Sequence, residues 1–348
     1  MCSPVGMHDE ATVHEIDLSG FRDGDARDRA GVARAFDAAG SDNGFIRLVG
    51  HGVDWALVDA AFDVWQSFFD RPLDEKVVFA AGPEADGMVG YTEYGKQALA
   101  YTAGQESPPD LLEAYSIGRD DVDGSFFDEY RAWFPRNIWP DAPVELPAAV
   151  AALERELHRV ADTVLRAMAL ALELPEPWFV ERAAHAVVTT RCNHYLRGPG
   201  VAPLPDQPGL GAHTDYGMMT LLIADPVPGL QVRRGDQWYD VVPPPGTITC
   251  NLGDMLAMWT NDRWVSTMHR VAPPVPGGQA VRRRSIARFL DGDPSVTISA
   301  IPSCVGEGDA PRYPTVQAGE WLMAKIVGGQ SAQPVDLHEG GLTGSTRR

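Results

Sequence analysis

His213 and Asp215 stand two positions apart in the segment GAHTDYG, and this spacing is the most chemically informative feature of the sequence. Residues i and i+2 of an extended chain point to the same side, so an imidazole and a carboxylate can converge there on one ion. His269, at the start of a predicted strand, is the best candidate for a third ligand. Two histidines and one carboxylate form the facial set that holds non-haem Fe(II) and leaves coordination positions open for reactants. The spacing therefore indicates a catalytic metal site.

Zinc can use the same ligand types, so the cysteines bear on the kind of metal site that is present. Cys2, Cys192, Cys250 and Cys304 are scattered, without the paired spacing of a structural zinc site or the density of a disulfide framework. We expect free thiols at these positions, and an open catalytic site rather than a closed structural one.

The elements that must position the ligands differ between the two halves of the chain. The longest predicted helix, over residues 148–172, carries one apolar stripe that marks a buried face. From residue 187 onward, about eight short strands alternate with Gly and Pro turns, the pattern of a jelly roll or sandwich. The stretch over 81–105 has no period and is expected to be an extended loop near a site. The other predicted elements are strands at 15–18 and 45–49 and helices at 29–39, 56–69 and 320–327.

Further motifs occur in order around the candidate ligands. They are Asp17, Gly44-Phe45, His51-Gly52, Asn193-His-Tyr195, GLQV at 229–232, NLGDM at 251–255, WTND at 259–262, STMHRV at 266–271 and RRS at 283–285. Together with GAHTDYG, this set resembles the iron- and 2-oxoglutarate-dependent dioxygenases of the isopenicillin N synthase-like family, over nearly all of residues 14–332.

The resemblance implies a mainly β fold with flanking helices: a double-stranded β-helix, or jelly-roll barrel, buttressed by N-terminal helices. We expect an N-terminal dioxygenase region over 14–145 that supplies helical support and substrate-side loops. The Fe(II)/2-oxoglutarate jelly roll with its C-terminal helix would occupy 146–335, and a flexible tail would follow over 336–348.

The resemblance also implies roles for individual residues. The iron ligands of the family match His213, Asp215 and His269. Arg283 and Ser285 match an Arg-x-Ser pair that binds the distal carboxylate of 2-oxoglutarate, a task suited to a planar guanidinium because it can meet a carboxylate bidentately. Tyr195 matches a tyrosine that assists, and Asn193 is a candidate for the same co-substrate side, although it could also be a strand-end cap.

Some positions differ from the family pattern, and others are predicted to have a structural role only. After Ser285 the family usually has two aromatic residues, whereas this chain reads Ile-Ala-Arg-Phe. Strand alternation puts Phe289 on the iron side and turns Arg288 away, where we expect a surface residue. Related iron halogenases replace the ligand carboxylate with a small residue, so Asp215 argues against halogenation. His51 is predicted to be structural, and His185 and His194 have no assigned role.

The implied reaction uses O2 and couples decarboxylation of 2-oxoglutarate, to succinate and CO2, with oxidation of a small molecule. Hydroxylation is the expected outcome, desaturation and cyclisation are alternatives, and ascorbate is expected to stimulate turnover. Three other interpretations stay open. A succinate assay would reveal an oxidase that does not use 2-oxoglutarate, headspace gas analysis would reveal an ethylene-forming enzyme, and failure to bind one Fe(II) per chain would indicate a non-catalytic binding module.

The composition of the chain limits the kinds of molecule that we expect the protein to bind. The 348 residues include 29 Lys plus Arg against 48 Asp plus Glu, a formal charge of −19 that disfavours nucleic acid. No apolar run approaches the length of a membrane helix and residues 1–10 lack signal-peptide features, so we expect a cytoplasmic protein with no membrane partner.

A small metabolite, as in secondary metabolism, is the expected substrate. The substrate-side candidates are Tyr91, Tyr94, Tyr115 and Phe289, and residues 90–104 are a candidate lid.

Overall fold

An eight-stranded sheet forms the centre of the molecule in the computed structural model, which describes residues 13–82, 88–100, 107–122, 124–195, 204, 207–273 and 282–331. In spatial order its strands are β1 (His14–Asp17), β2 (Phe45–Val49), β10 (Ile248–Leu252), β7 (Met219–Ala224), β12 (Arg283–Gly292), β5 (Val187–Tyr195), β4 (Glu113–Gly118) and β3 (Gly90–Thr92). Only the β1–β2 pair in this sheet is parallel. Strands distant in sequence are neighbours in this sheet, and one such pair, β12 with β5, brings the predicted co-substrate residues together.

A second sheet of four strands carries two of the candidate iron ligands. Its order is β6 (Leu210–His213), β11 (His269–Val271), β8 (Leu230–Arg234) and β9 (Gln237–Asp240). Phe45 of the large sheet packs with Leu230 and Val232 of the small one, so apolar side chains fill the space between the two sheets at this point. The arrangement confirms the predicted jelly roll. A third, two-stranded sheet consists of β13 (Thr297–Ile298) and β14 (Val316–Gln317).

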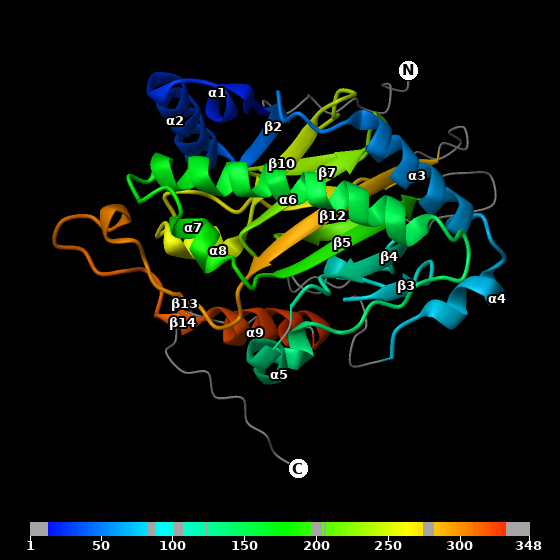
Figure 1. The fold of residues 1–348 in the computed structure, drawn as a ribbon. Coiled ribbons are helices and arrows are strands. Elements are labelled where there is room, and N and C mark those ends of the chain that lie inside the picture. The colour runs from blue at the N-terminus through cyan, green and yellow to red at the C-terminus, as the bar shows by residue number, and fades with distance from the viewer. Residues whose placement is uncertain are drawn as a thin grey trace, which may run out of the picture.

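Helices cover the outer face of the large sheet (Figure 1). The described α-helices are α1 (Ser19–Arg22), α2 (Ala26–Asp42), α3 (Trp55–Phe69), α4 (Leu73–Lys76), α5 (Gly124–Tyr130), α6 (Leu146–Ala171), α7 (Trp178–Arg182), α8 (Asp254–Trp259) and α9 (Ala318–Ser331). Short 3-10 helices occur at Val77–Phe79, Arg131–Trp133 and Pro302–Cys304. None of the described helices has the length and apolarity needed to cross a membrane.

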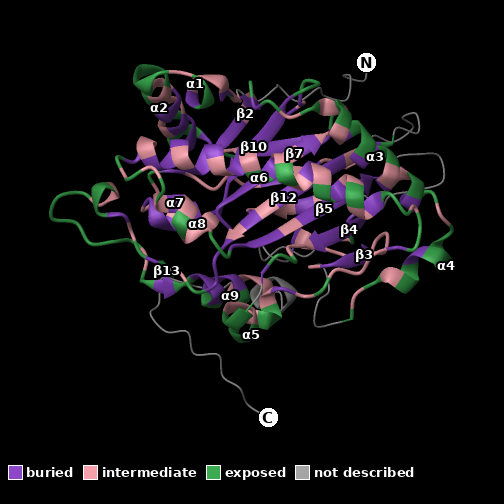
Figure 2. Cartoon of the chain, viewed as in Figure 1, coloured by how far each residue is buried: buried purple, intermediate pink, exposed green. Residues whose placement is uncertain are grey.

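The long helix α6 supplies the main apolar contact with the sheet. Leu153, Leu157, Val160 and Val164 are at most 2% exposed and belong to one cluster with outer-face strand residues such as Ile286. Figure 2 shows the corresponding pattern, with largely buried strands beneath helices that have both buried and exposed sides. The apolar stripe predicted for this helix is therefore core.

Local sequence signals account for the start of two further helices. Asp25 accepts hydrogen bonds from the N–H groups of Arg27 and Asp28, while Asp28 accepts from the Asp25 N–H, so a capping box starts α2 earlier than predicted. Asp54 caps α3 in a similar way by accepting from Ala56 N–H.

The stretch predicted as an extended loop is partly a strand. Gly90–Thr92 pairs with β4 at the edge of the large sheet, so this end of the candidate lid is fixed by backbone hydrogen bonds. Tyr101, from the other end of that segment, Cys2 and the predicted tail at 336–348 lie outside the described residues.

Candidate active site

Three predicted ligands meet between the sheets. His213 ends β6 and pairs directly with His269, the first residue of β11. Asp215 Oδ1 lies 3.6 Å from His213 Nε2 and 3.7 Å from His269 Nε2. All three residues are buried, and one ligand atom from each lies within 4.8 Å of the other two. Two imidazole nitrogens and one carboxylate oxygen are the donor set of a non-haem Fe(II) site with open positions.

Backbone carbonyls set the orientation of both imidazoles. His213 Nδ1 donates to Gly211 O at 2.8 Å, and His269 Nδ1 donates to Thr267 O at 3.0 Å. A carbonyl only accepts, so each Nδ1 carries the proton and each Nε2 presents its lone pair to the metal position. Burial, and the neighbouring His269, lower the pKa of His213, which keeps it in the neutral form that a metal requires.

The second oxygen of Asp215 has its own partners. Asp215 Oδ2 accepts from Asn251 Nδ2 at 2.6 Å and from the Thr220 hydroxyl. Burial raises the pKa of Asp215, but the two histidines and these two donors outweigh burial and hold it below its usual value. Asn251 and Thr220 face each other on β10 and β7. Thr220 carries no motif, and only the pairing of the two strands brings it to the ligand.

The predicted co-substrate residues lie together on β12 and β5. Arg283 pairs with Tyr195, with the guanidinium carbon 4.8 Å from the tyrosine ring centroid, and Ser285 pairs with Asn193. Asn193 Nδ2 donates to Ser285 Oγ at 3.4 Å. The four side chains therefore form one polar patch on the iron-facing side of the large sheet.

Arg283 has unfilled hydrogen-bonding capacity. Its side chain is 1% exposed, and its Nε and Nη1 have no hydrogen-bond partner within the described part of the chain. Leaving buried charged donors unpaired is costly, and a carboxylate is the group that best satisfies a guanidinium. The residues present therefore fit one carboxylate end of 2-oxoglutarate.

Three of the four substrate-side candidates lie on strands, and these three separate onto two faces of the sheet. Phe289 lies on the iron-facing side, opposite Thr220. Tyr91 and Tyr115 pair with each other and point the other way, into the core beneath α3, where Tyr115 contacts Trp65 and Phe68. The prediction that these two tyrosines face the substrate is wrong, because the register of β3 and β4 turns them towards the helices.

Tyr91 belongs instead to a buried polar cluster behind the sheet. Glu113 accepts from Lys76 Nζ at 2.6 Å, from Tyr91 Oη at 2.6 Å and from His194 Nδ1 at 2.9 Å. Through its bond to Glu113, His194 is part of this buried cluster and has a structural role. The Tyr94 hydroxyl is buried, and none of the described residues hydrogen-bonds to it.

Arg288 points away from the iron, as predicted, but it is not a surface residue. It is 3% exposed, and its Nε donates to Glu154 of α6 at 3.1 Å. The prediction of surface exposure is wrong because α6 covers that face of β12.

His51 has the structural role that the sequence predicts. Its Nε2 donates to Gly246 O, and its Nδ1 accepts from Val53 N–H.

Two family models match the chain. The model described as the non-haem dioxygenase in morphine synthesis N-terminal region matches residues 13–142, and that of the 2OG-Fe(II) oxygenase superfamily matches residues 186–292. Similar curated proteins include a validamycin A dioxygenase from Streptomyces hygroscopicus subsp. limoneus, 33% identical over 90% of this chain and 85% of the relative. A homoarginine-6-hydroxylase from Oryza sativa subsp. japonica is 29% identical over 85% of this chain and 88% of the relative.

Comparison with solved structures also finds proteins of this oxygenase superfamily. A full-length protein of Neurospora crassa, crystallised in complex with alpha-KG, has a TM-score of 0.79 and 29% identity, and the match covers 94% of this chain and 99% of that one. A 2OG-Fe(II) oxygenase family protein from Caulobacter crescentus has a TM-score of 0.78 and 30% identity, over 91% and 99% of the two chains. The chain therefore belongs to the 2-oxoglutarate/Fe(II) oxygenase superfamily and is a non-haem, 2-oxoglutarate-dependent dioxygenase.

Proposed function

We propose that this dioxygenase hydroxylates a small metabolite held beside Phe289, with iron bound by His213, Asp215 and His269. Arg283 and Ser285, with Tyr195 and Asn193 beside them, would hold 2-oxoglutarate. The observation that carries the proposal is the buried ligand triad together with the buried Arg283 guanidinium, whose Nε and Nη1 have no hydrogen-bond partner among the described residues. Relatives whose names specify validamycin A and homoarginine support a small molecule as substrate.

Bound Fe(II) would supply the centre at which 2-oxoglutarate and oxygen react. The protein's own residues bind, orient and exclude water. Arg283 would fix one end of 2-oxoglutarate, and burial raises the pKa of Tyr195, so its hydroxyl stays protonated and able to donate. The largely buried iron-facing surface limits access of water to the reacting groups.

The metal assignment is tested by replacing each ligand with alanine. We expect the His213→Ala, Asp215→Ala and His269→Ala proteins to remain folded, lose stoichiometric Fe(II) binding in anaerobic titration and form no succinate. His185→Ala is a matched control, because His185 is half-exposed and lies outside the site. Substantial succinate formation by His269→Ala, or restoration of activity to chelated enzyme by Zn(II) alone, would contradict the assignment.

Product analysis separates this proposal from its alternatives. Hydroxylation predicts one succinate and one oxygenated product per turnover, whereas an oxidase predicts product without succinate. Ethylene in the headspace would indicate fragmentation of 2-oxoglutarate itself. Desaturated or cyclised products would keep the succinate yield and change only the substrate chemistry.

The proposed setting is the cytoplasm, without a nucleic acid partner. The formal charge of −19 over the whole chain supports the second part, because it disfavours binding to a polyanion. Cell fractionation and a DNA-binding assay at low salt test the two parts separately.

A further inference from the structure

The loop that carries Asp215 is held by the start of α8. This ligand loop comprises residues 214–218, between β6 and β7. Three successive backbone N–H groups, those of residues 253–255, donate to its carbonyls at 2.8 to 3.1 Å, and the N–H of Asp254 donates to the carbonyl of Asp215 itself. A Cβ at Gly253 would lie 2.2 Å from a carbonyl oxygen of the loop, so this close approach requires glycine.

The side chain of Asp254 joins the same loop to the C-terminal helix α9. Its Oδ2 accepts from the Thr214 hydroxyl at 3.2 Å and lies 2.8 Å from Lys325 Nζ of α9. The Asp254 side chain is 15% exposed and that of Lys325 is 25% exposed, so water screens this ion pair less than it screens a surface pair. Only Asp254 therefore stands between Lys325 and the backbone of the ligand Asp215.

Helix α9 also contacts the residue that follows Asp215. Trp321 Nε1 donates to the carbonyl of Tyr216 at 3.1 Å, and the Trp321 side chain is buried. Lys325 Nζ lies 4.7 Å from the centroid of the Trp321 ring and 5.7 Å from that of the Tyr216 ring, within the range of cation–π attraction. Through these contacts and through Asp254, the ligand loop is connected to α9 on both sides of Asp215.

The beginning of α9 has anchors of its own. Ala318 N–H donates to Val296 O at 2.8 Å, and Gly319 N–H donates to Pro294 O at 3.1 Å, so the helix begins against the chain that leaves β12. Leu322 is buried in the main apolar core. Lys325 therefore reaches Asp254 from a helix that the rest of the fold holds in place.

We propose that Lys325 is a positioning residue of the iron site, and that docking of α9 and binding of Fe(II) stabilise each other. Lys325 acts through Asp254 and Tyr216 on the ligand loop, which lowers the cost of ordering Asp215 when the metal binds. The inference rests on the proposed function and adds a helix distant from the ligands to the structure that sets iron affinity.

Replacement of Lys325 by methionine keeps an unbranched apolar stem and removes the charge. We expect Lys325→Met to weaken Fe(II) binding by roughly 3- to 10-fold in anaerobic titration, less than loss of a residue that touches a ligand side chain. Lys325→Arg should stay within about 2-fold of wild type, because a guanidinium can still pair with Asp254. Glu320→Gln is the matched control, since it removes an exposed charge from the same helix and should leave Fe(II) affinity unchanged.

Two further variants test the route. Asp254→Asn keeps the backbone N–H that binds Asp215 and removes the carboxylate, so Lys325→Met should add no further loss of Fe(II) affinity to it. Trp321→Phe keeps a buried ring and removes only the donor to Tyr216, and it should also weaken Fe(II) binding. If Lys325→Met does not fold, Trp321→Phe and the Asp254→Asn protein decide the inference by the same measurement.

Hydrogen exchange supplies a readout that a purely structural role would not change. Coupling between two sites is reciprocal, so Fe(II) should slow exchange of the backbone amides of residues 321–325 in wild type, and should slow it less in Lys325→Met. Urea unfolding of the metal-free proteins gives the stability of each variant separately.

The inference is overturned if Lys325→Met and Trp321→Phe both bind Fe(II) as tightly as wild type, or if Fe(II) leaves exchange in α9 unchanged. It is also overturned if Lys325→Met lowers stability in urea without any change in Fe(II) affinity. Failure of wild type to bind one Fe(II) per chain would count against the proposed function, whereas normal binding with unaffected variants counts only against the role of Lys325.

Discussion

Each candidate iron ligand of this oxygenase is held in place by residues that would not themselves bind the metal. The carboxylate of Asp215 is held through its second oxygen by Asn251 and Thr220, and the two imidazoles are held by the carbonyls of Gly211 and Thr267. These contacts select one rotamer and one tautomer before metal arrives, so iron affinity should respond to residues outside the triad.

Replacement of Asn251 by alanine should weaken Fe(II) binding by roughly 10- to 100-fold, because the carboxylate loses a donor that orients it. Anaerobic Fe(II) titration measures the change. Thr249→Val is a matched control, since Thr249 lies on the same strand and is also buried but makes no contact with a ligand among the described hydrogen bonds. Equal losses in the two variants would mean that the strand, and not the amide, matters.

Arg283→Ala should lower the affinity for 2-oxoglutarate by roughly 10- to 100-fold, since a charge-assisted contact contributes about 1.5 to 3 kcal/mol. Fe(II) binding should survive. The exposed neighbour Arg282, which pairs with Asp70, provides the control variant Arg282→Ala. If Arg283→Ala instead raises KM for the primary substrate and leaves 2-oxoglutarate dependence unchanged, the pair is a substrate clamp and the oxidase alternative gains support.

At the scale of elements, helix α6 is attached to the sheet by a polar contact as well as by its apolar stripe. Glu154 accepts from the Thr190 hydroxyl of β5 and from Arg288 Nε of β12. The two strands are those that carry Asn193, Tyr195, Arg283 and Ser285 on their opposite face. The contact therefore stabilises the strands on which the proposed 2-oxoglutarate patch is built.

Glu154→Ala should lower the free energy of unfolding by roughly 2 to 3 kcal/mol, because it leaves the buried Arg288 guanidinium without its carboxylate. Urea denaturation measures the loss. Glu156→Ala, on the same helix, removes only a partly exposed i,i+3 pair with Arg159 and should cost less than about 0.5 kcal/mol. A loss of similar size in both variants would argue that helix propensity, and not the buried pair, is responsible.

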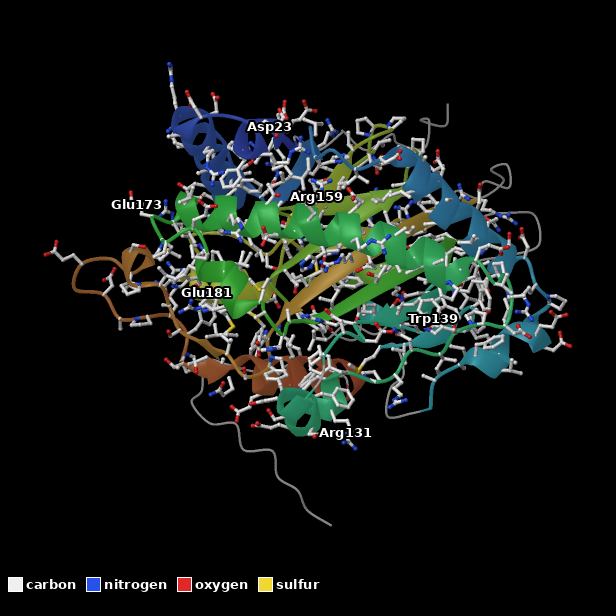
Figure 3. All side chains as sticks on the ribbon, in the orientation of Figure 1. Asp23, Arg131, Trp139, Arg159, Glu173 and Glu181 are labelled. Atoms are coloured by element: carbon white, nitrogen blue, oxygen red, sulfur yellow. The ribbon has the colours of Figure 1, made fainter. Side chains whose placement is uncertain are left out.

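At the scale of the whole molecule, His51 connects three regions distant in sequence. Its ring donates from Nε2 to Gly246 O just before β10, its Nδ1 accepts from Val53 N–H, and its carbonyl accepts from Arg159 of α6 at 3.1 Å. Figure 3 labels Arg159 on the helix that crosses the sheet. Burial lowers the pKa of His51, because the charged ring is disfavoured there and protonation of Nδ1 would break the bond to Val53.

The sign of the resulting pH dependence follows from that lowered pKa. The neutral His51 contributes stability that is fully present above the unfolded pKa of about 6.5 and is lost as pH falls through the folded-state value below it. The difference in unfolding free energy between wild type and His51→Gln should therefore shrink as the pH falls from 7 towards 5. A difference that is constant over this range would contradict a neutral, buried His51.

The sequence by itself determined what depends on neighbours along the chain. An i, i+2 spacing puts His213 with Asp215, and Arg283 with Ser285, on one side of a strand wherever that strand lies, and an apolar stripe marks α6 as a core helix. His269 was the best candidate for a third ligand from its place at the start of a predicted strand. The resemblance of ordered motifs supported this choice, because no local rule could bridge its distance along the chain. The division into regions at 145 and 146 stays a prediction.

Only the tertiary structure decided which side of each strand faces the metal. Successive residues of a strand point to opposite faces of the sheet, but this alternation does not determine which face lies towards the metal. Hydrophobicity does not decide it either, because both faces of this large sheet are buried. Tyr91 and Tyr115 therefore face α3 and not the substrate, and Arg288 is buried against α6. Strand pairing likewise brought Thr220 to Asp215. Such contacts are set by register between strands far apart in sequence, which no local pattern records.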